Sequence, residues 1–200
     1  LVELRDGGHG SITIGGAVSP AGGNFEEPVT QATLKVVGCF LGLSRDRANA
    51  RRYPAIHPLE SWSKYSSVVD TAQVARARRL LRQGNEVAQM MKVVGEEGTP
   101  TSDFVVYLKS EFLDAVYLQQ NTFDRTDGAT SRERQRHVFA KVVQVLDTAF
   151  TFADKAAARA YFQKLRQHVI DWNYAPWDSA EFATREQAIE ALVAEAAVTA

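Results

Sequence analysis

The stretch DTAQVARARRLLRQGNEVAQMMKVV, residues 70–94, decides the fold that this sequence predicts. Its apolar side chains recur at helical intervals, as at Val74, Leu81 and Met91, and so fall on one face of an α-helix. Gly95 follows directly, and glycine is common just after the end of a helix. The stretch therefore predicts one long helix over these residues.

A second helix is predicted from about residue 103 to residue 119. Its apolar residues are four positions apart, at Phe104, Leu108, Phe112 and Val116. The link between the two helices is short, so we expect them to lie side by side and antiparallel. Starts of further helices are indicated by capping residues at Thr130, Asp154 and Thr184.

The first part of the chain has a different pattern. Ser11-Ile-Thr-Ile14 alternates polar and apolar residues, which favours a strand, and residues 15–28 are rich in the glycine, proline and serine of loops. We therefore predict a mainly α protein. Residues 1–29 form a short β and loop segment, and residues 30–200 form a bundle of five or six helices.

Composition restricts the classes of partner. The chain has a formal net charge of −1, which gives no field for binding nucleic acid or an anionic membrane. Four arginines in residues 76–82 leave RNA binding open as an alternative to a solvated face paired with acids. We expect no direct insertion into a membrane, because no apolar run approaches the roughly 18 residues that a spanning helix needs.

Cysteine and histidine give no sign of a metal site. The single cysteine, Cys39, lies in an apolar run and is predicted as core, and the lack of a second cysteine fits a reducing cytoplasm. The histidines show no metal-ligand spacing with one another or with Cys39. We therefore expect no bound metal in this chain.

Three ordered blocks carry a resemblance. They are GSITIGGAVSPAGGNFEEPVT at residues 10–30, RYPAIHPLES at residues 52–61 and YLQQNTFD at residues 117–124. Together they resemble the catalytic A subunit of V-type and archaeal-type rotary ATPases over most of residues 11–152. The phosphate-binding motif G-x-x-x-x-G-K-[ST] does not occur in these residues.

The resemblance implies a place in a larger subunit. Residues 1–29 are then the C-terminal edge of an α/β nucleotide-binding domain, and residues 30–200 are the C-terminal helical bundle. The intact subunit would bind ATP or ADP with Mg²⁺ and couple hydrolysis or synthesis to H⁺ or Na⁺ transport. Its partners would be B subunits, alternating with it in a hexameric ring, and central stalk subunits, on the cytoplasmic periphery of the membrane. This chain alone should hold no cofactor and have no ATPase activity.

The resemblance also implies nucleotide contacts. Tyr53 and Phe123 match aromatic residues on the two sides of an adenine ring, and a flat ring is suited to stacking on a base. Gln120 and Asn121 have amides that can bond to the base or ribose. For these two residues, capping the preceding helix is an equally good interpretation.

A second functional region is the link between the two long helices. It carries Glu96 and Glu97, with Asp103 at the start of the next helix. The resemblance implies that this hairpin contacts the rotor, and the alternative is a solvated tip whose acids cap helices. A different class also remains open, namely a helical interaction module that is related to the A subunit and has lost its motor.

Overall fold

The computed structural model describes residues 2–3, 5, 7–23, 25–65 and 68–197. The chain forms two compact units, Leu1–Phe40 and Leu41–Ala200. These are units of packing within this stretch of chain. The domain boundary that the sequence predicts between residues 29 and 30 stays a prediction.

The first unit contains short elements. Strands β1 and β2 pair antiparallel, with Glu3 opposite His9. The elements in chain order are β1 (Val2–Glu3), β2 (His9–Gly10), the 3₁₀ turn η1 (Ala21–Gly23), α1 (Pro28–Val36) and β3 (Cys39–Phe40). Pro28 opens α1, where its fixed φ angle suits the first helical position and its missing amide proton costs nothing.

Two predictions for this unit are wrong. Residues 11–14 have no regular structure, and Ile12 and Ile14 are 85% and 89% exposed. An alternating pattern makes a strand only where another strand supplies hydrogen bonds. Cys39 is exposed and is not core, because neighbouring side chains of a strand point to opposite sides. Phe40 is the residue of β3 that packs, with its ring edge-on to Phe25 at 5.8 Å.

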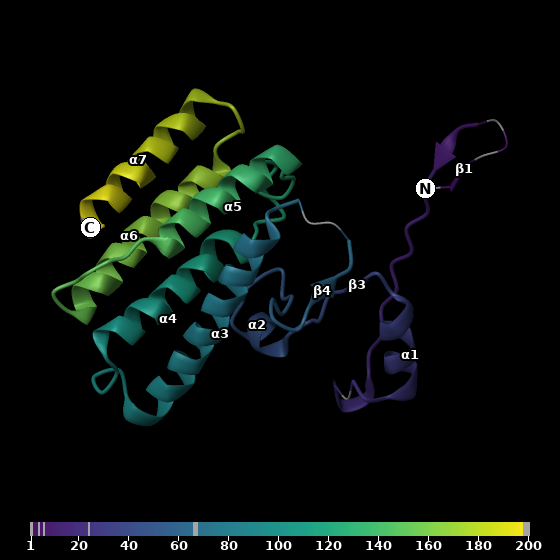
Figure 1. Ribbon diagram of the computed structural model, residues 1–200, viewed down its shortest axis with the longest axis horizontal. Coiled ribbons are helices and arrows are strands. Elements are labelled where there is room, and N and C mark those ends of the chain that lie inside the picture. The colour runs from purple at the N-terminus through teal and green to yellow at the C-terminus, as the bar shows by residue number, and fades with distance from the viewer. Residues whose placement is uncertain (1, 4, 6, 24, 66–67, 198–200) are drawn as a thin grey trace. The chain divides into compact units, whose positions relative to one another are not determined.

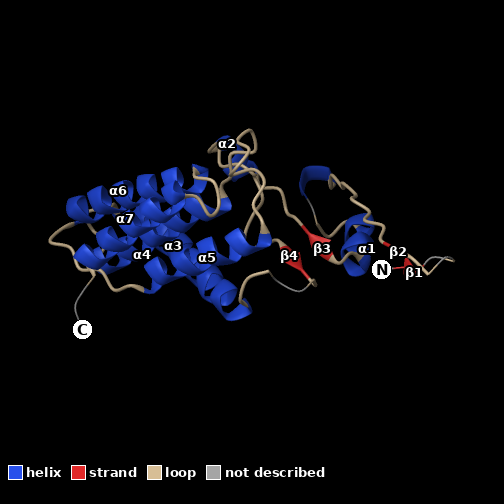
Figure 2. Ribbon diagram, turned by 90° about the horizontal axis from the view of Figure 1, so that it is seen from above, coloured by secondary structure: helices blue, strands red, loops and turns tan. Residues whose placement is uncertain are grey.

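The second unit is a bundle of long helices (Figure 1). Its elements are α2 (Arg45–Asn49), β4 (Trp62–Ser63), α3 (Thr71–Val94), α4 (Thr101–Leu113), the π-helical turn η2 (Asp114–Leu118), α5 (Arg132–Asp147), α6 (Lys155–Tyr174) and α7 (Ala180–Ala196). Figure 2 shows that helices dominate the described chain and that its strands are short. The mainly α fold that the sequence predicts is confirmed.

Helices α3 and α4 form an antiparallel hairpin and lie side by side (Figure 1). Asp70 caps α3 by accepting a hydrogen bond from the backbone N–H of Gln73 at 2.8 Å. Gly95 ends the helix with a φ of 77°, which glycine adopts without strain. Near the middle of α3, Gly84 lies so close to Ser110 of α4 that a Cβ at Gly84 would be 2.2 Å from the Ser110 Cβ. The missing side chain lets the two helices approach.

The core lies among α3, α4, α5, α6 and α7. Phe104 and Phe112 of α4 and Leu165 of α6 are at most 1% exposed. Trp172 of α6 is equally buried, and its indole N–H donates to the carbonyl of Phe182 in α7 at 3.1 Å. Large buried aromatics with satisfied polar atoms contribute much of the stability of such a bundle. The C-terminal helix α7 packs on the bundle through Phe182, Ile189 and Leu192, which are at most 7% exposed.

Helices α5 and α7 begin at residues other than those predicted. The hydroxyl of Ser131 caps α5, whereas Thr130 bonds back into the preceding loop. Ser179 caps α7, and Thr184 lies inside that helix, with its hydroxyl bonded to the carbonyl one turn earlier. In both helices the capping residue is a serine: Ser131 directly follows Thr130, and Ser179 precedes Thr184 by five residues. The sequence pattern therefore predicted both helices but not their first residues.

Candidate functional site

Tyr53 lies on a loop that follows the short helix α2. The base of the loop is closed by a backbone hydrogen bond from Ser44 to Ala55 at 2.8 Å. Tyr53 is joined to Pro54 by a cis peptide bond, and its side chain is 55% exposed. The structure therefore presents this predicted site residue at the surface of the second unit.

Phe123 lies in the turn after η2. In η2 the backbone N–H of Gln119 bonds to the carbonyl of Asp114, five residues back, at 3.1 Å. Such π-helical turns occur frequently at functional sites. The chain then turns at Asn121, whose side-chain Oδ1 accepts from the backbone N–H of Phe123 at 3.1 Å. The Phe123 side chain is 99% exposed, so it forgoes the roughly 1.5–3 kcal/mol that burial of such a side chain would contribute.

The structure brings these two segments together. The backbone N–H of Gln120 donates to the carbonyl oxygen of Tyr53 at 3.0 Å. Residues 67 positions apart in the sequence are thus neighbours, so the segments that carry the exposed side chains of Tyr53 and Phe123 adjoin.

The side-chain amides of the predicted site are bonded within the chain. The Nε2 of Gln120 donates to the carbonyl of Asp127 at 2.9 Å. The Nδ2 of Asn121 donates to the hydroxyl of Tyr174 at 3.3 Å, and its backbone N–H donates to the Asp127 carboxylate at 2.6 Å. These bonds shape the turn that carries Phe123.

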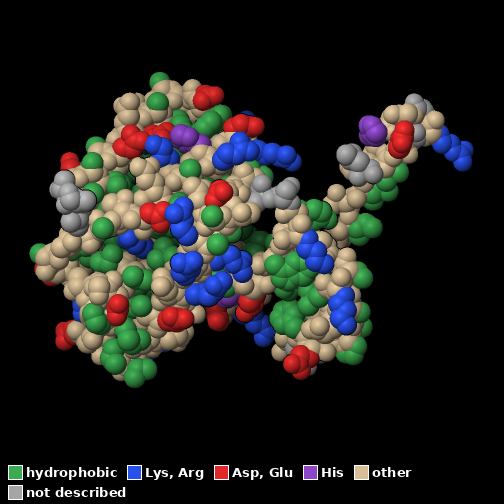
Figure 3. All heavy atoms as spheres, viewed as in Figure 1, with side chains coloured by type: hydrophobic (Ala, Val, Ile, Leu, Met, Phe, Trp, Pro, Cys, Tyr) green, Lys and Arg blue, Asp and Glu red, His purple; other side chains and the backbone are tan. Residues whose placement is uncertain are grey.

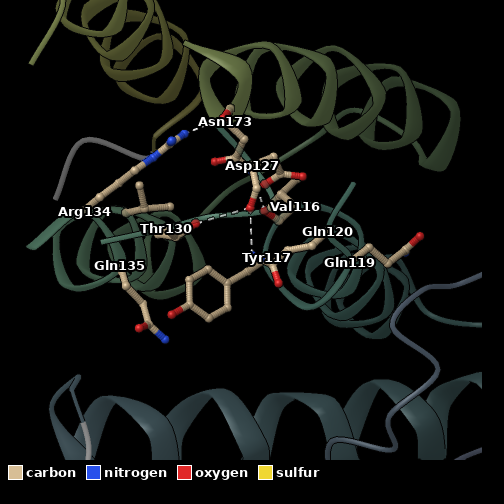
Figure 4. Close-up of a pocket in the computed structure, with 11 residues that line it drawn as sticks. Val116, Tyr117, Gln119, Gln120, Asp127, Thr130, Arg134, Gln135 and Asn173 are labelled. Atoms are coloured by element: carbon tan, nitrogen blue, oxygen red, sulfur yellow. Dashed lines mark hydrogen bonds between the residues drawn. The ribbon is translucent and has the colours of Figure 1, made fainter. Parts of the chain in front are cut away.

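A pocket of about 340 Å³ lies beneath that turn (Figure 4). Gln120 and Thr130 both point at the carbonyl of Asp127, and Arg134 points at Asn173. Burial raises the pKa of Asp127, against the opposing effects of the hydrogen bond from Asn121 and of the Arg134 charge. The polar groups that line the pocket bond largely to one another, and these bonds hold the turn in place.

An ion-pair network that sequence reasoning missed connects the two segments. The Asp114 carboxylate accepts from Arg47 at 2.5 Å and from Arg52 at 2.7 Å. Arg52 also forms a forked pair with Glu111, at 3.1 and 2.7 Å. The bond with Glu111 is the main cause that raises the pKa of Arg52, and burial opposes it. Only the charge of these residues was visible in the sequence.

The three acidic residues of the hairpin link have different surroundings. Glu96 is ion-paired with Arg159 of α6 at 2.6 Å. Glu97 is exposed, and Asp103 is half-buried in the first turn of α4. The Nζ of Lys155 donates to the backbone carbonyls of Glu96 and Glu97, at 2.5 and 3.0 Å. The link is therefore tied to α6 as well as to its own two helices.

The basic patch of α3 is partly used inside the chain. Arg76 pairs with Asp147 at 3.3 Å, and Arg78 donates to the carbonyls of Pro58 and Leu59 at 2.7 and 2.8 Å. Figure 3 shows basic and acidic side chains interspersed over the bundle face in view. A nucleic-acid surface needs a concentrated basic field, so this distribution does not favour RNA binding.

Among the residues that the structure describes, no group of three or more His, Cys, Asp or Glu side chains is arranged to hold a metal ion. None of the helices described is both long and apolar enough to cross a lipid bilayer.

Comparison with known proteins gives two family matches, one after the other along the chain. Residues 2–63 match the nucleotide-binding domain of the ATP synthase alpha/beta family. Residues 70–162 match the C-terminal domain of V and A type ATP synthase. The chain belongs to the V/A-type ATP synthase alpha-chain family. It carries the C-terminal domain of such a chain, which confirms the resemblance found in the three sequence blocks.

Relatives of this chain are close in sequence. The V-type ATP synthase alpha chain of Treponema denticola is 60% identical over 197 residues, which is 98% of this chain and 33% of that protein. The alpha chain of Borrelia garinii is 56% identical over 193 residues, or 96% of this chain and 34% of that protein. The chain thus spans about a third of the length of the curated relatives it matches.

A solved structure shares the fold. It is the structure of an ATP synthase subunit, NeqB, from Nanoarcheaum equitans, with a TM-score of 0.52 and 18% sequence identity. The match covers 62% of this chain and 33% of that one. At this identity the likeness concerns the fold alone, and it agrees with the mainly α bundle described above.

Proposed function

We propose that this alpha-chain segment supplies the adenine contacts of the catalytic subunit. Tyr53 and Phe123 stack on the base, and Gln120 and Asn121 lie beside it. The observation that carries the proposal is the bond from Gln120 to Tyr53, at 3.0 Å, which holds two segments with exposed aromatic rings together. An exposed phenylalanine and an exposed tyrosine on adjoining segments suit stacking on the face of a flat aromatic base.

The amide side chains have a supporting role in this proposal. Both Gln120 and Asn121 donate to groups of their own chain, so they hold the turn in place. A bound base would either compete for these N–H groups or accept a hydrogen bond from the second hydrogen atom of each side-chain amide. Their first contribution is therefore to the position of Phe123.

In the whole protein, this segment works with parts that lie outside these 200 residues. The intact subunit binds ATP or ADP with Mg²⁺, alternates with B subunits in a hexameric ring and drives or follows a central stalk. The complex couples ATP hydrolysis or synthesis to H⁺ or Na⁺ transport from the cytoplasmic face of a membrane. Phosphoryl transfer depends on a phosphate loop, which these residues do not contain, so the 200-residue chain should not hydrolyse ATP by itself.

The hairpin link is the second part of the proposal. Glu97 is exposed at the end of two long packed helices, while Glu96 is held by Arg159 and Asp103 begins α4. We place Glu97 at the rotor contact and assign Glu96 and Asp103 to the rigidity of the link. In the assembled complex, Glu97→Lys should lower the number of ions transported per ATP, whereas Glu97→Gln should have a small effect. Equal transport ratios for both variants and the unmodified complex would argue against a rotor contact at Glu97.

The adenine contacts are tested in the full-length subunit. Tyr53→Ala and Phe123→Ala should each raise the ADP dissociation constant about 5- to 150-fold, because a base stacked on an aromatic side chain gains about 1–3 kcal/mol. Tyr65→Ala is the matched control, since Tyr65 is also exposed, at 73%, and lies outside the site. If both site variants bind ADP as tightly as the control does, the proposed base contact is wrong.

The motorless interaction module is not favoured as an alternative. The relatives at 56–60% identity are named ATP synthase alpha chains, and the match extends over nearly all of this chain. No contact or pocket in the described residues points to a separate binding function of that kind.

A further inference from the structure

Asp114 is a buried carboxylate on which separate segments of the chain converge. Its side chain is 5% exposed. It accepts hydrogen bonds from Arg47 Nη1 at 2.5 Å, from Arg52 Nη1 at 2.7 Å and from Gln119 Nε2 at 3.4 Å. Arg47 comes from α2, whereas the other two donors come from loops. Asp114 itself is the first residue of the π-helical turn η2.

The two loop donors are the immediate neighbours of proposed site residues. Arg52 precedes Tyr53, and Gln119 precedes Gln120. The Tyr53 carbonyl in turn accepts from the Gln120 backbone N–H at 3.0 Å. One carboxylate therefore holds both arms of the surface on which the aromatic rings are presented.

Among the described residues, Asp114 is the only acidic side chain that pairs with Arg47. Arg47 is 9% exposed, and its Nε and Nη2 atoms are buried without a hydrogen-bond partner among the described residues. Arg52 differs, because it also has the forked pair with Glu111, whose side chain is 38% exposed. Removing one partner of a buried pair leaves an uncompensated charge, so the segment that carries Arg47 and Arg52 would shift to find solvent or another acceptor.

We propose that Asp114 is a positioning residue for the base of the bound nucleotide: it fixes the Arg52–Tyr53 segment against the Gln119–Gln120 segment and so sets affinity for adenine. The inference rests on the proposed adenine contacts and adds the residue that aligns them. The inference assigns this role to Asp114 and not to Glu111. The described hydrogen bonds of the Glu111 side chain go to Arg52 and none goes to the Gln119 segment.

Base affinity can be separated from phosphate affinity and from folding. Full-length alpha chain in the assembled complex would carry Asp114→Asn, which keeps the shape of the side chain and removes its charge. The dissociation constants of ADP and of inorganic tripolyphosphate would be measured for each variant, together with the thermal unfolding midpoint. Asp147→Asn is the matched control, because Asp147 also pairs with an arginine, at 3.3 Å, on an exposed part of the bundle.

We expect Asp114→Asn to weaken ADP binding about tenfold, within the range that stacking of one base supplies, and to change tripolyphosphate binding less than about twofold. The Asp147→Asn control should leave both constants unchanged. Arg52→Gln is a second test that does not depend on how Asp114→Asn folds. It keeps the pair between Arg47 and Asp114 and removes the bond between Asp114 and the residue that precedes Tyr53. It should therefore weaken ADP binding by the same factor and leave tripolyphosphate binding nearly unchanged.

Two results would overturn the inference. One is a folded Asp114→Asn variant that binds ADP like the control. The other is an equal loss of ADP and tripolyphosphate binding in Arg52→Gln, since a general structural defect would weaken both ligands. The Tyr53→Ala variant separates the two proposals. If it weakens ADP binding while Asp114→Asn and Arg52→Gln do not, only the positioning role is wrong. If Tyr53→Ala has no effect, the adenine contact fails and the positioning role fails with it.

Discussion

Replacing Gly84 by alanine would place a methyl group where α3 and α4 touch. The new Cβ would lie 2.2 Å from the Cβ and 2.4 Å from the Oγ of Ser110. Carbon atoms in favourable contact are about 3.5–4.0 Å apart. A different rotamer can move the Ser110 Oγ, but the Cβ is attached to the backbone and cannot move alone. The two helices must therefore separate locally.

The expected loss of stability follows from two opposing effects. Forcing an extra methyl group into a packed site costs about 1–3 kcal/mol, and a clash with an atom fixed to the backbone belongs at the upper end. Alanine in place of glycine returns about 1 kcal/mol of helix propensity. The net loss is about 2 kcal/mol, which lowers the melting temperature of a chain of this length by about 4–8 °C.

Thermal unfolding followed by far-ultraviolet circular dichroism would measure this shift. Asn85→Ala is the control, because Asn85 is the exposed next residue of the same helix and the change adds helix propensity without a clash. The double variant Gly84→Ala, Ser110→Gly moves the gap to the other helix and should recover part of the loss. A Gly84→Ala chain that melts at or above the temperature of the unmodified chain would refute the close-contact argument.

Further predictions concern the bundle. Glu186 lies 2.9 Å from His137 Nε2; burial would raise its pKa, but the hydrogen bonds from His137 and a neighbouring lysine outweigh burial and lower it. A lowered carboxylate pKa contributes stability at pH values above its ordinary value of 4.5, and this contribution is lost as the pH falls below that value. The difference in the free energy of urea unfolding between the unmodified chain and Glu186→Gln should therefore shrink on acidification. A constant difference from pH 7 to pH 3 would contradict this. Lys109 donates to the carbonyls of Leu146 and Thr148 at the C-terminal end of α5, at 2.7 Å each, and Lys109→Met should cost about 1–3 kcal/mol in the same assay, with a loss below about 0.5 kcal/mol counting against the role. Trp172→Ala should cost about 3–5 kcal/mol, since Trp172 is 1% exposed, and an unchanged urea midpoint would exclude its place in the core.

Sequence periodicity predicted the long helices well. The first helix was expected over residues 70–94, and α3 runs from Thr71 to Val94 with Asp70 as its cap. Periodicity works here because apolar residues at helical spacing face the rest of the bundle, as Ala77 and Leu81 do in α3. Periodicity failed at residues 11–14, where polar and apolar residues alternate, because such a pattern forms a strand only if a neighbouring strand is present. It also missed the π-helical turn η2, because one extra residue in a turn leaves the apolar spacing almost unchanged.

The candidate site was found through resemblance and positioned only by the structure. The segments around Tyr53 and Phe123 are recognisable only from known motifs, because an exposed aromatic residue has no periodic signal. The bond from Gln120 to Tyr53 and the pairs that Asp114 forms with Arg47 and Arg52 are long-range contacts. A single sequence gives charges and spacing, but it does not pair one arginine among many with one particular aspartate.

The attachment of the hairpin link to α6 has a mechanical consequence. Lys155 holds the backbone carbonyls of Glu96 and Glu97, and Arg159 holds the side chain of Glu96. A load applied to the link is therefore shared with the first turns of α6, and α6 packs along α4 and α7. Displacement of the link would rotate the bundle as one stiff body instead of bending two helices away from it.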